Sequence, residues 1–296
     1  MSFEMVHALK SEFSVSAACS ALGLSRSGYY EWASRRARSE PSEREAEQRR
    51  LEHTVMTAFD ENRGVYGRPR MQVELREKGI KIGANRLRKI MRKLGLQAKP
   101  RRKHKRTTLS DHDARVSSNL LDRDFSSPAP NRIWVSDITY IRTWEGWVYA
   151  CFIIDLFSRK VVGWAVANHM RADLVTSAFD MAVSRRCPPR GLIFHSDRGS
   201  QYVSKALRRR LRRCKMLQSM SRAGDCWDNA VAESFHDKLK AELVFRHLWP
   251  TRASVEPAVA DYVERFYNPR RKHSSLNYLS PDQFENQNVA AIAVAA

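Results

Sequence analysis

Long apolar runs and paired cysteines are both missing from this sequence. No stretch of about 18 or more apolar residues occurs among its 296 residues, and Met1–Lys10 lacks the basic-then-apolar layout of a signal peptide. The five cysteines are scattered, and no C-x-x-C pair occurs among them. This pattern argues against a disulfide framework and a zinc knuckle, and it suits a reducing compartment. We therefore expect no membrane partner.

Acidic residues are scarce as well. The chain has 52 Lys and Arg against 32 Asp and Glu, so its formal net charge is +20. Two runs contain no acid at all: residues 81–106 hold twelve Lys or Arg, and Lys205–Lys215 holds seven. A solvated surface is the alternative for any one run, but two such runs favour contact with phosphates. We expect a DNA-binding protein with a cytoplasmic, nucleoid-associated location.

The first hundred residues have helical patterns. Residues 1–40 contain two short helices about a turn at Gly23 and predict a helix-turn-helix-like segment. Residues 50–98 predict an accessory helix-turn-helix DNA-binding region, and residues 99–130 predict a basic linker. The basic residues predicted to contact DNA in these two parts are Arg86, Arg88, Lys89, Arg92, Lys93, Arg101, Arg102 and Lys103.

Strand patterns begin at Asn131. The expected strands are Ile133–Ile141, Trp147–Asp155, Lys160–Ala167, Leu192–Phe194 and Met216–Met220, and the expected helices are Arg171–Arg186, Ser204–Arg213 and Asp228–Leu248. This order predicts an α/β fold, a ribonuclease-H-like catalytic core with a mixed five-stranded sheet and flanking helices, preceded by an all-α helix-turn-helix region. The core should span residues 131–250, with a helical extension and tail at 251–296. Trp134, Trp147 and Trp164 are expected to be buried.

Three carboxylates fall where such a sheet would bring them together. Asp137 lies mid-strand, Asp197 ends a strand, and Glu233 lies on the last helix of the core. Burying an acid on a central strand is costly unless it is paired or bound to a metal, and ligands bind at the carboxyl ends of strands in open α/β sheets. Mg²⁺ prefers carboxylate oxygens, and two such ions about 3.5–4 Å apart serve phosphodiester cleavage. We predict that the three acids are catalytic and bind two Mg²⁺ ions, with Mn²⁺ as a substitute.

Several short sequence motifs resemble those of a known protein family. They are Trp134-Val-Ser-Asp-Ile-Thr-Tyr140, His195-Ser-Asp-Arg-Gly-Ser-Gln-Tyr202, Glu233-Ser-Phe235 and Tyr267-Asn-Pro-Arg270, and 35 residues separate Asp197 from Glu233. From about residue 50 to 285 the chain resembles the B-frame product of bacterial insertion-sequence transposases, which have a retroviral-integrase-like D-D-E core. The resemblance implies a polynucleotidyl transferase that carries out Mg²⁺-dependent DNA strand cleavage and strand transfer at insertion-sequence ends.

The last core helix offers two further DNA-contact candidates. Asn229, Glu233 and Lys240 are spaced by four and seven residues and should share one helix face. Asn229 and Lys240 are therefore predicted to contact DNA, and the resemblance implies the same for Lys240. Its alternative is a solvated lysine.

Other polar residues have open assignments. His195 is expected to pack or form hydrogen bonds, with a catalytic role as the alternative. Asp155 is expected to close the turn after the second strand, with a place near the site as the alternative. Asn268, Arg270 and His273 either touch DNA or brace the active-site helix.

The expected partners are double-stranded DNA (element ends and target), further copies of the chain in a homo-oligomer, and an upstream-frame protein. The last follows from the resemblance, because the active protein of this family is often a frameshift fusion, and residues 1–60 show no sustained heptad seam. Two alternative functions stay open: a structure-specific nuclease of the same fold, and a non-catalytic DNA-binding regulator of transposition.

Overall fold

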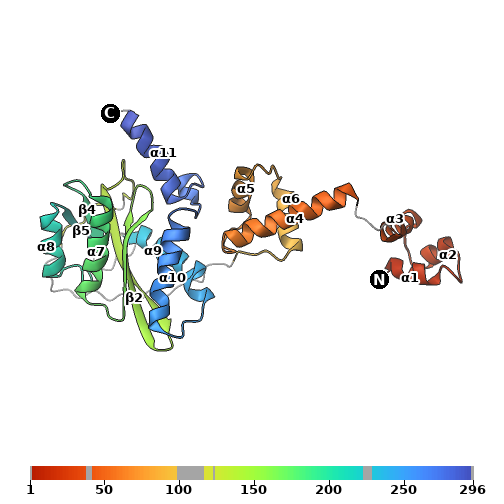
Figure 1. Ribbon diagram of the computed structural model, residues 1–296, viewed down its shortest axis with the longest axis horizontal. Coiled ribbons are helices and arrows are strands. Elements are labelled where there is room, and N and C mark those ends of the chain that lie inside the picture. Colours follow the sequence, from red (N-terminus) through yellow and green to blue (C-terminus); the bar gives the residue numbers. More distant parts are fainter. Residues whose placement is uncertain (1, 38–41, 99–116, 123, 223–228, 295–296) are drawn as a thin grey trace. The chain divides into compact units, whose positions relative to one another are not determined.

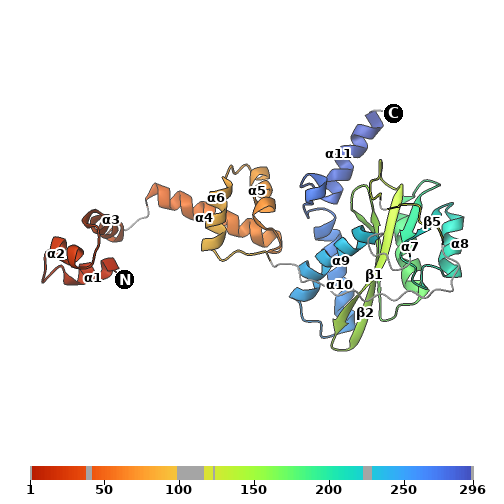
Figure 2. The same ribbon diagram turned by 180° about the vertical axis from the view of Figure 1, so that it is seen from behind.

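The computed structural model describes residues 2–37, 42–98, 117–122, 124–222 and 229–294 (Figures 1 and 2). The chain divides into two compact units, Met1–Thr57 and Ala58–Ala296. Within the described ranges, no helix has the length and apolar character needed to cross a membrane. Arg101, Arg102 and Lys103 lie outside the described residues.

The first unit is helical. It contains α1 (Ser2–Leu9), α2 (Val15–Ala21), α3 (Arg26–Ala37) and the beginning of α4 (Glu43–Glu61). The Ser14 side chain caps α2 by accepting the backbone N–H of Ala17 at 3.2 Å, and Gly23 adopts a φ of 64° in the turn that follows. Val6, Cys19 and Tyr29 are buried between these short helices.

The second unit begins with a helix pair, α5 (Arg68–Glu77) and α6 (Ala84–Lys93). Gly67 precedes α5 and Pro69 stands in its first turn, where a missing N–H costs no helical hydrogen bond. The residues buried on the two helices are Met71, Leu75, Leu87, Ile90 and Met91. Burial of one stripe on each helix leaves the basic residues of α6 exposed.

The sheet has five strands in the order β3-β2-β1-β4-β5. They are β1 (Ile133–Thr143), β2 (Gly146–Asp155), β3 (Val161–Ala167), β4 (Ile193–Ser196) and β5 (Leu217–Met220). β1 pairs antiparallel with β2, and β2 with β3, whereas β1 with β4 and β4 with β5 are parallel. β1 is 11 residues long and β4 only 4, so β1 continues past the end of its parallel neighbour.

Helices cover both faces of the sheet. α7 (Ala172–Arg186) and α8 (Lys205–Arg213) lie on one side, and α9 (Ala230–Glu242) and α10 (Val255–Ala260) on the other (Figures 1 and 2). Side chains of β2 alternate accordingly: Cys151 and Ile153 join the core under α7 and α8, whereas the Phe152 ring lies 4.8 Å from the Phe235 ring of α9. This layered, mixed sheet confirms the predicted fold class.

Gly163 marks the closest approach between α7 and the sheet. A Cβ atom at this position of β3 would lie 2.3 Å from the backbone oxygen of Ala178 and 2.7 Å from the Cβ of Ala182. Glycine therefore allows the helix backbone to rest directly on the strand.

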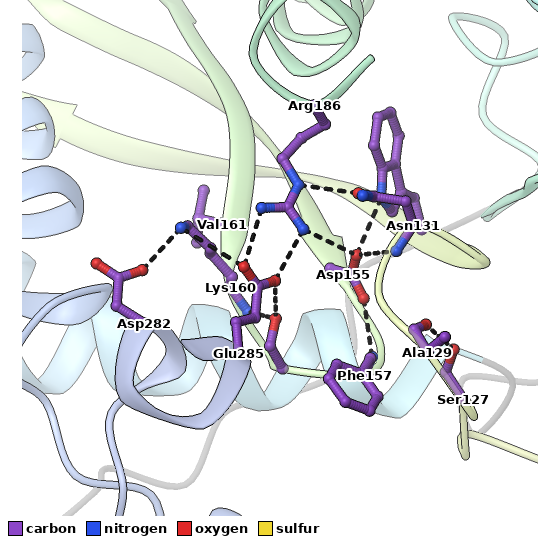
Figure 3. A network of polar contacts seen from close by, with 12 residues as sticks. Ser127, Ala129, Asn131, Asp155, Phe157, Lys160, Val161, Arg186, Asp282 and Glu285 are labelled. Atoms are coloured by element: carbon purple, nitrogen blue, oxygen red, sulfur yellow. Dashed lines mark hydrogen bonds and ion pairs between the residues drawn. The ribbon is translucent and has the colours of Figure 1, made fainter. Parts of the chain in front are cut away.

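A polar network ties the C-terminal helix to the sheet (Figure 3). The remaining elements are η2 (Val244–Arg246), η3 (Arg252–Ser254), η4 (Asp261–Tyr267), η5 (Ser274–Leu276) and α11 (Pro281–Val294). Glu285 of α11 accepts two hydrogen bonds of 2.9 Å from Arg186 and one of 2.7 Å from the Ser158 hydroxyl. Beside them, buried Asp155 accepts the backbone N–H of Phe157 at 2.9 Å, which confirms its predicted turn-closing role.

Two local predictions were wrong. Trp134 and Trp164 are buried, but Trp147 is 41% exposed, because it stands at the start of β2 where the hairpin is open to solvent. The helix α9 ends at Glu242 instead of Leu248, because Leu243 leaves the helical region (φ −124°, ψ −65°) and a short 3₁₀ turn follows.

Candidate active site

The sheet brings two of the predicted carboxylates to adjacent strand positions. Ser136 of β1 and Ser196 of β4 are register partners in the parallel ladder, and Asp137 and Asp197 follow them. Backbone donors hold both side chains: Ile138 N–H donates to Asp137 Oδ1 at 2.8 Å, and Gly199 N–H donates to Asp197 Oδ1 at 3.0 Å. The two acids therefore stand together where the β1–β4 ladder ends.

The environment of Asp197 disfavours its charged form. Burial raises the pKa of this carboxyl, and the negative charge of Asp137 raises it further, to about 6, although the Gly199 N–H acts in the opposite direction. Within the described residues, the side chain that lies against Asp137 is His236, whose Nδ1 is 3.4 Å from Oδ2. No Lys or Arg of the described chain is paired with either acid, so the site concentrates negative charge.

Three buried side chains next to Asp137 contact one another: Ser136, Tyr202 and Cys151. The Ser136 hydroxyl contacts the Tyr202 hydroxyl at 3.0 Å and the Cys151 sulfur at 3.5 Å. Burial raises the pKa of Cys151 to about 12, so its thiol stays protonated at neutral pH. A protonated buried thiol is a poor nucleophile.

Helix α9 runs alongside β1, and its contacts follow the strand in order. The Asn229 side-chain amide donates to Ser136 O at 3.3 Å, His236 contacts Asp137, and Lys240 Nζ lies 5.0 Å from the centre of the Tyr140 ring. Glu233 lies between Asn229 and His236 on this helix and is exposed. In the described ranges, no three His, Cys, Asp or Glu side chains gather closely enough to hold a metal ion. Convergence of Glu233 on the aspartates therefore stays a prediction.

The predicted DNA contacts differ in accessibility. Arg86, Arg88, Lys89, Arg92 and Lys93 are all exposed on α6. Asn229 is only 5% exposed, and its side-chain oxygen has no hydrogen-bond partner among the described residues. Lys240 is half-buried. All these DNA contacts stay predictions.

A buried ion pair that sequence reasoning missed anchors the C-terminal end of α9. Arg271 Nε donates to Glu242 Oε2 at 2.7 Å, and the Tyr262 hydroxyl donates to the same oxygen at 2.9 Å. Burial by itself lowers the pKa of Arg271, but the hydrogen bonds and charge of Glu242 outweigh it, and the pKa is raised above its ordinary value. His236 was missed too, although its position three residues after Glu233 was the available signal.

The segment around Asn268 braces the fold. Its side chain accepts the Val161 N–H at 3.0 Å and donates to the Val161 carbonyl at 2.9 Å, so it completes the start of β3. His273 is buried edge-on against the Tyr267 ring at 5.0 Å, and the backbone carbonyl of Arg270 accepts the Tyr66 hydroxyl at 3.0 Å. His195 is also buried and bridges Ser219 at 2.8 Å and Ser221 at 3.3 Å, which confirms its predicted hydrogen-bonding role.

Family models and curated relatives cover nearly all of the chain. Two models described as integrase core domain match residues 127–226 and 215–281, and an HTH-like domain model matches residues 45–104. The transposase InsF for insertion sequence IS3A of Escherichia coli (strain K12) is 40% identical over 290 residues, which is 98% of this chain and 100% of that protein. The insertion element IS600 uncharacterized 31 kDa protein of Shigella sonnei is 40% identical over 269 residues, covering 91% and 97% of the two chains.

Solved structures are more distant. A chain of the simian T-cell lymphotropic virus intasome in complex with PP2A regulatory subunit B56 gamma has a TM-score of 0.45 and 14% identity, covering 74% of this chain and 70% of that one. The HTLV-2 integrase catalytic core domain in complex with magnesium (dimeric form) has a TM-score of 0.41 and 17% identity, covering 54% of this chain and 99% of that one.

Proposed function

The chain belongs to the insertion-sequence transposases with an integrase core, a polynucleotidyl transferase family, and from this premise we propose that Asp137, Asp197 and Glu233 bind the metal ions of its DNA cleavage and strand-transfer site. The observation that carries the proposal is the pair of aspartates that directly follow the end of the β1–β4 ladder, where burial and the charge of Asp137 raise the pKa of Asp197. A bound cation stabilises two like charges that are held together.

The donor set fits magnesium. Carboxylate oxygens are the ligands that Mg²⁺ prefers, whereas zinc prefers sets of thiolate and imidazole ligands. Asp137, Asp197 and Glu233 would hold two Mg²⁺ ions, with Mn²⁺ able to replace them. When bound, such ions activate the attacking oxygen and stabilise the leaving oxygen of an in-line displacement.

The surrounding residues position the carboxylates. The N–H groups of Ile138 and Gly199 each fix one oxygen of an aspartate, so the other oxygen of each is held in a defined direction. His236 lies next to the second oxygen of Asp137 and limits its rotation. Such supporting contacts raise the precision of a ligand set.

DNA is the substrate in this proposal. The exposed basic face of α6 binds the element ends through their phosphates, and Lys240 holds the strand next to the carboxylates. Joining an element to a target requires two ends and a target duplex, so we infer that the chain works as a homo-oligomer on DNA, with an upstream-frame protein as a further partner.

Strand cleavage and strand transfer on a duplex that carries an element end test this proposal. The wild type should cut and join only with Mg²⁺ or Mn²⁺ present. Asp137→Asn, Asp197→Asn and Glu233→Gln should each lose more than about a hundredfold in rate, because even outer-shell partners of metal ligands cost 10–100-fold. Asp180→Asn is the matched control, since that exposed acid pairs with Arg210 at 2.9 Å on α8.

Each other outcome contradicts part of the proposal. Cutting without joining would indicate a structure-specific nuclease. Unchanged activity in Glu233→Gln would remove this residue from the site, and DNA binding without any cleavage would indicate a regulator.

A further inference from the structure

Two aromatic rings of the β1–β2 hairpin contact two cations, Arg142 of β1 and Lys240 of α9. Lys240 Nζ lies 5.0 Å from the centre of the Tyr140 ring, and Arg142 Cζ lies 5.0 Å from that of Trp147. The two rings meet edge-on, with centroids 5.1 Å apart and an angle of 87°. Lys240, Tyr140, Trp147 and Arg142 thus form a continuous cation–aromatic row.

An aromatic partner leaves the positive charge of each cation intact. A carboxylate partner neutralises a cation, as Glu264 does for Arg185 at 2.7 Å. A ring holds the cation through its quadrupole and adds no charge. Within the described part of the chain, neither Arg142 nor Lys240 has a carboxylate partner. The row is therefore a positioned, uncompensated pair of positive charges.

The row is accessible and continuous with the carboxylate site. Tyr140 and Trp147 are each 41% exposed, and Arg142 is exposed. Tyr140 follows Asp137 by three residues on the part of β1 that extends past the end of its ladder with β4, so the two side chains leave opposite faces of the strand. Lys240 connects the row to the carboxylate side, because it comes from α9, the helix that carries Glu233, and reaches the Tyr140 ring. A strand that leaves the carboxylates along this open part of β1 would meet Lys240 first and then the rest of the row.

We propose that the cation–aromatic row binds the phosphate backbone of the DNA strand that occupies the carboxylate site. Arg142 is a second phosphate contact beside Lys240, and Tyr140 and Trp147 are positioning residues. Since three contacts of about 5 Å join the two cations, they are at most about 15 Å apart, so the row spans no more than roughly four nucleotide steps of about 3.4 Å. The identity of the ligand as DNA rests on the proposed function.

The salt dependence of DNA binding tests this proposal. Affinity of the full chain for an element-end duplex is measured by fluorescence anisotropy from roughly 50 to 200 mM salt, in a Glu233→Gln background so that no DNA is cut. Arg142→Gln and Lys240→Gln should each lower the slope of log affinity against log salt by about 0.9, the value for one phosphate contact. Arg185→Gln is the matched control and should leave the slope unchanged, because Glu264 already neutralises that side chain.

Substitutions of Tyr140 separate positioning from direct contact. Tyr140→Phe keeps the ring and should bind as the wild type does. Tyr140→Leu should lower the affinity for DNA about two- to fivefold and leave the salt slope unchanged. In a chain that already carries Lys240→Gln, Tyr140→Leu should cause no further loss of affinity.

Three results would overturn the proposal. The salt slope of DNA binding could be unchanged in Arg142→Gln, or Tyr140→Phe could bind DNA as weakly as Tyr140→Leu. The third is that the variants change the oligomeric mass of the protein and leave the salt slope as it is. The last would make the row an interface between copies. Absence of strand transfer in the wild type would instead refute the proposed function, and it would leave these binding measurements interpretable.

Discussion

The buried pair of Glu242 and Arg271 should determine whether the C-terminal end of α9 stays in place. The side chains are 11% and 2% exposed, respectively. Glu242 accepts hydrogen bonds from Arg271 and from the Tyr262 hydroxyl. Glu242→Leu would leave the Arg271 guanidinium buried with no carboxylate, on the helix that also carries Glu233.

The magnitude follows from this burial. Removing one partner of a buried ion pair costs about 3–5 kcal/mol, because the other charge stays desolvated. Replacing both partners with apolar residues is often neutral or stabilising. Glu242→Leu should therefore destabilise the unit by about 3–5 kcal/mol, and the double variant Glu242→Leu/Arg271→Leu should recover most of that stability.

Hydrogen exchange resolved along α9 is the suitable assay, because a chain of two compact units need not unfold in one step. Amides near Glu242 should exchange far faster in Glu242→Leu and should recover protection in the double variant. Asp180→Leu removes a partner of Arg210 from a half-exposed pair and serves as the control. Equal effects of Glu242→Leu and Asp180→Leu, or additive single effects in the double variant, would refute the reasoning.

Three further outcomes are expected. Burial raises the pKa of Asp155 to about 6. Between about pH 4 and 6 the folded state therefore holds more protons than the unfolded state, and the contribution of Asp155 to the free energy of unfolding should fall by about 3 kcal/mol as pH rises through this window. The difference in unfolding free energy between the wild type and Asp155→Asn should follow that fall, and a flat difference would contradict it. Gly163→Ala should cost about 1–3 kcal/mol and lower Tm by several degrees, because its Cβ would meet the backbone of α7. Gly83→Ala adds a Cβ with nothing within 4 Å, so it should lower Tm less than Gly163→Ala does, even at the N-cap of α6. Replacing Arg209, Arg212 and Arg213 of α8 by Gln should lower the salt slope of DNA binding by up to about 0.9 for each phosphate that the variant no longer binds, and an unchanged slope would show that this face is only solvated.

The sequence predicted what depends on local pattern. Alternation of apolar residues located the strands, and their order implied the sheet that brings Asp137 and Asp197 together. The same pattern could not show that Trp147 is exposed, because exposure depends on how far the flanking helices reach along the hairpin. The sequence pattern also predicted that α9 continues past Glu242, because residues that favour a helix continue beyond the point where the helix ends.

The sequence also could not predict ion pairs between residues far apart in the chain. Glu242 and Arg271 are 29 residues apart, and neither has a periodic signal that links it to the other. Arg271 even lies within the segment whose Asn268, Arg270 and His273 were candidates for DNA contact or bracing. Arg271 turns inward to Glu242 of α9, where Tyr262 and Tyr267 of η4 also contact the helix. Composition alone does not distinguish Arg271 from its basic neighbours.

The unequal lengths of β1 and β4 explain why Asp137 and two members of the cation–aromatic row, Tyr140 and Arg142, lie on one strand. Up to Ser136, β1 has neighbours on both sides and its residues are buried. Past that point β4 ends, and its chain turns away through Asp197 and Gly199. Asp137 is therefore the first residue of β1 with one strand edge open, and Tyr140 and Arg142 follow along the open part. The rigidity of a central strand and access to DNA thus both follow from the difference in length between β1 and β4. Lengthening β4 would bury the aspartates and would also block access of DNA to the row.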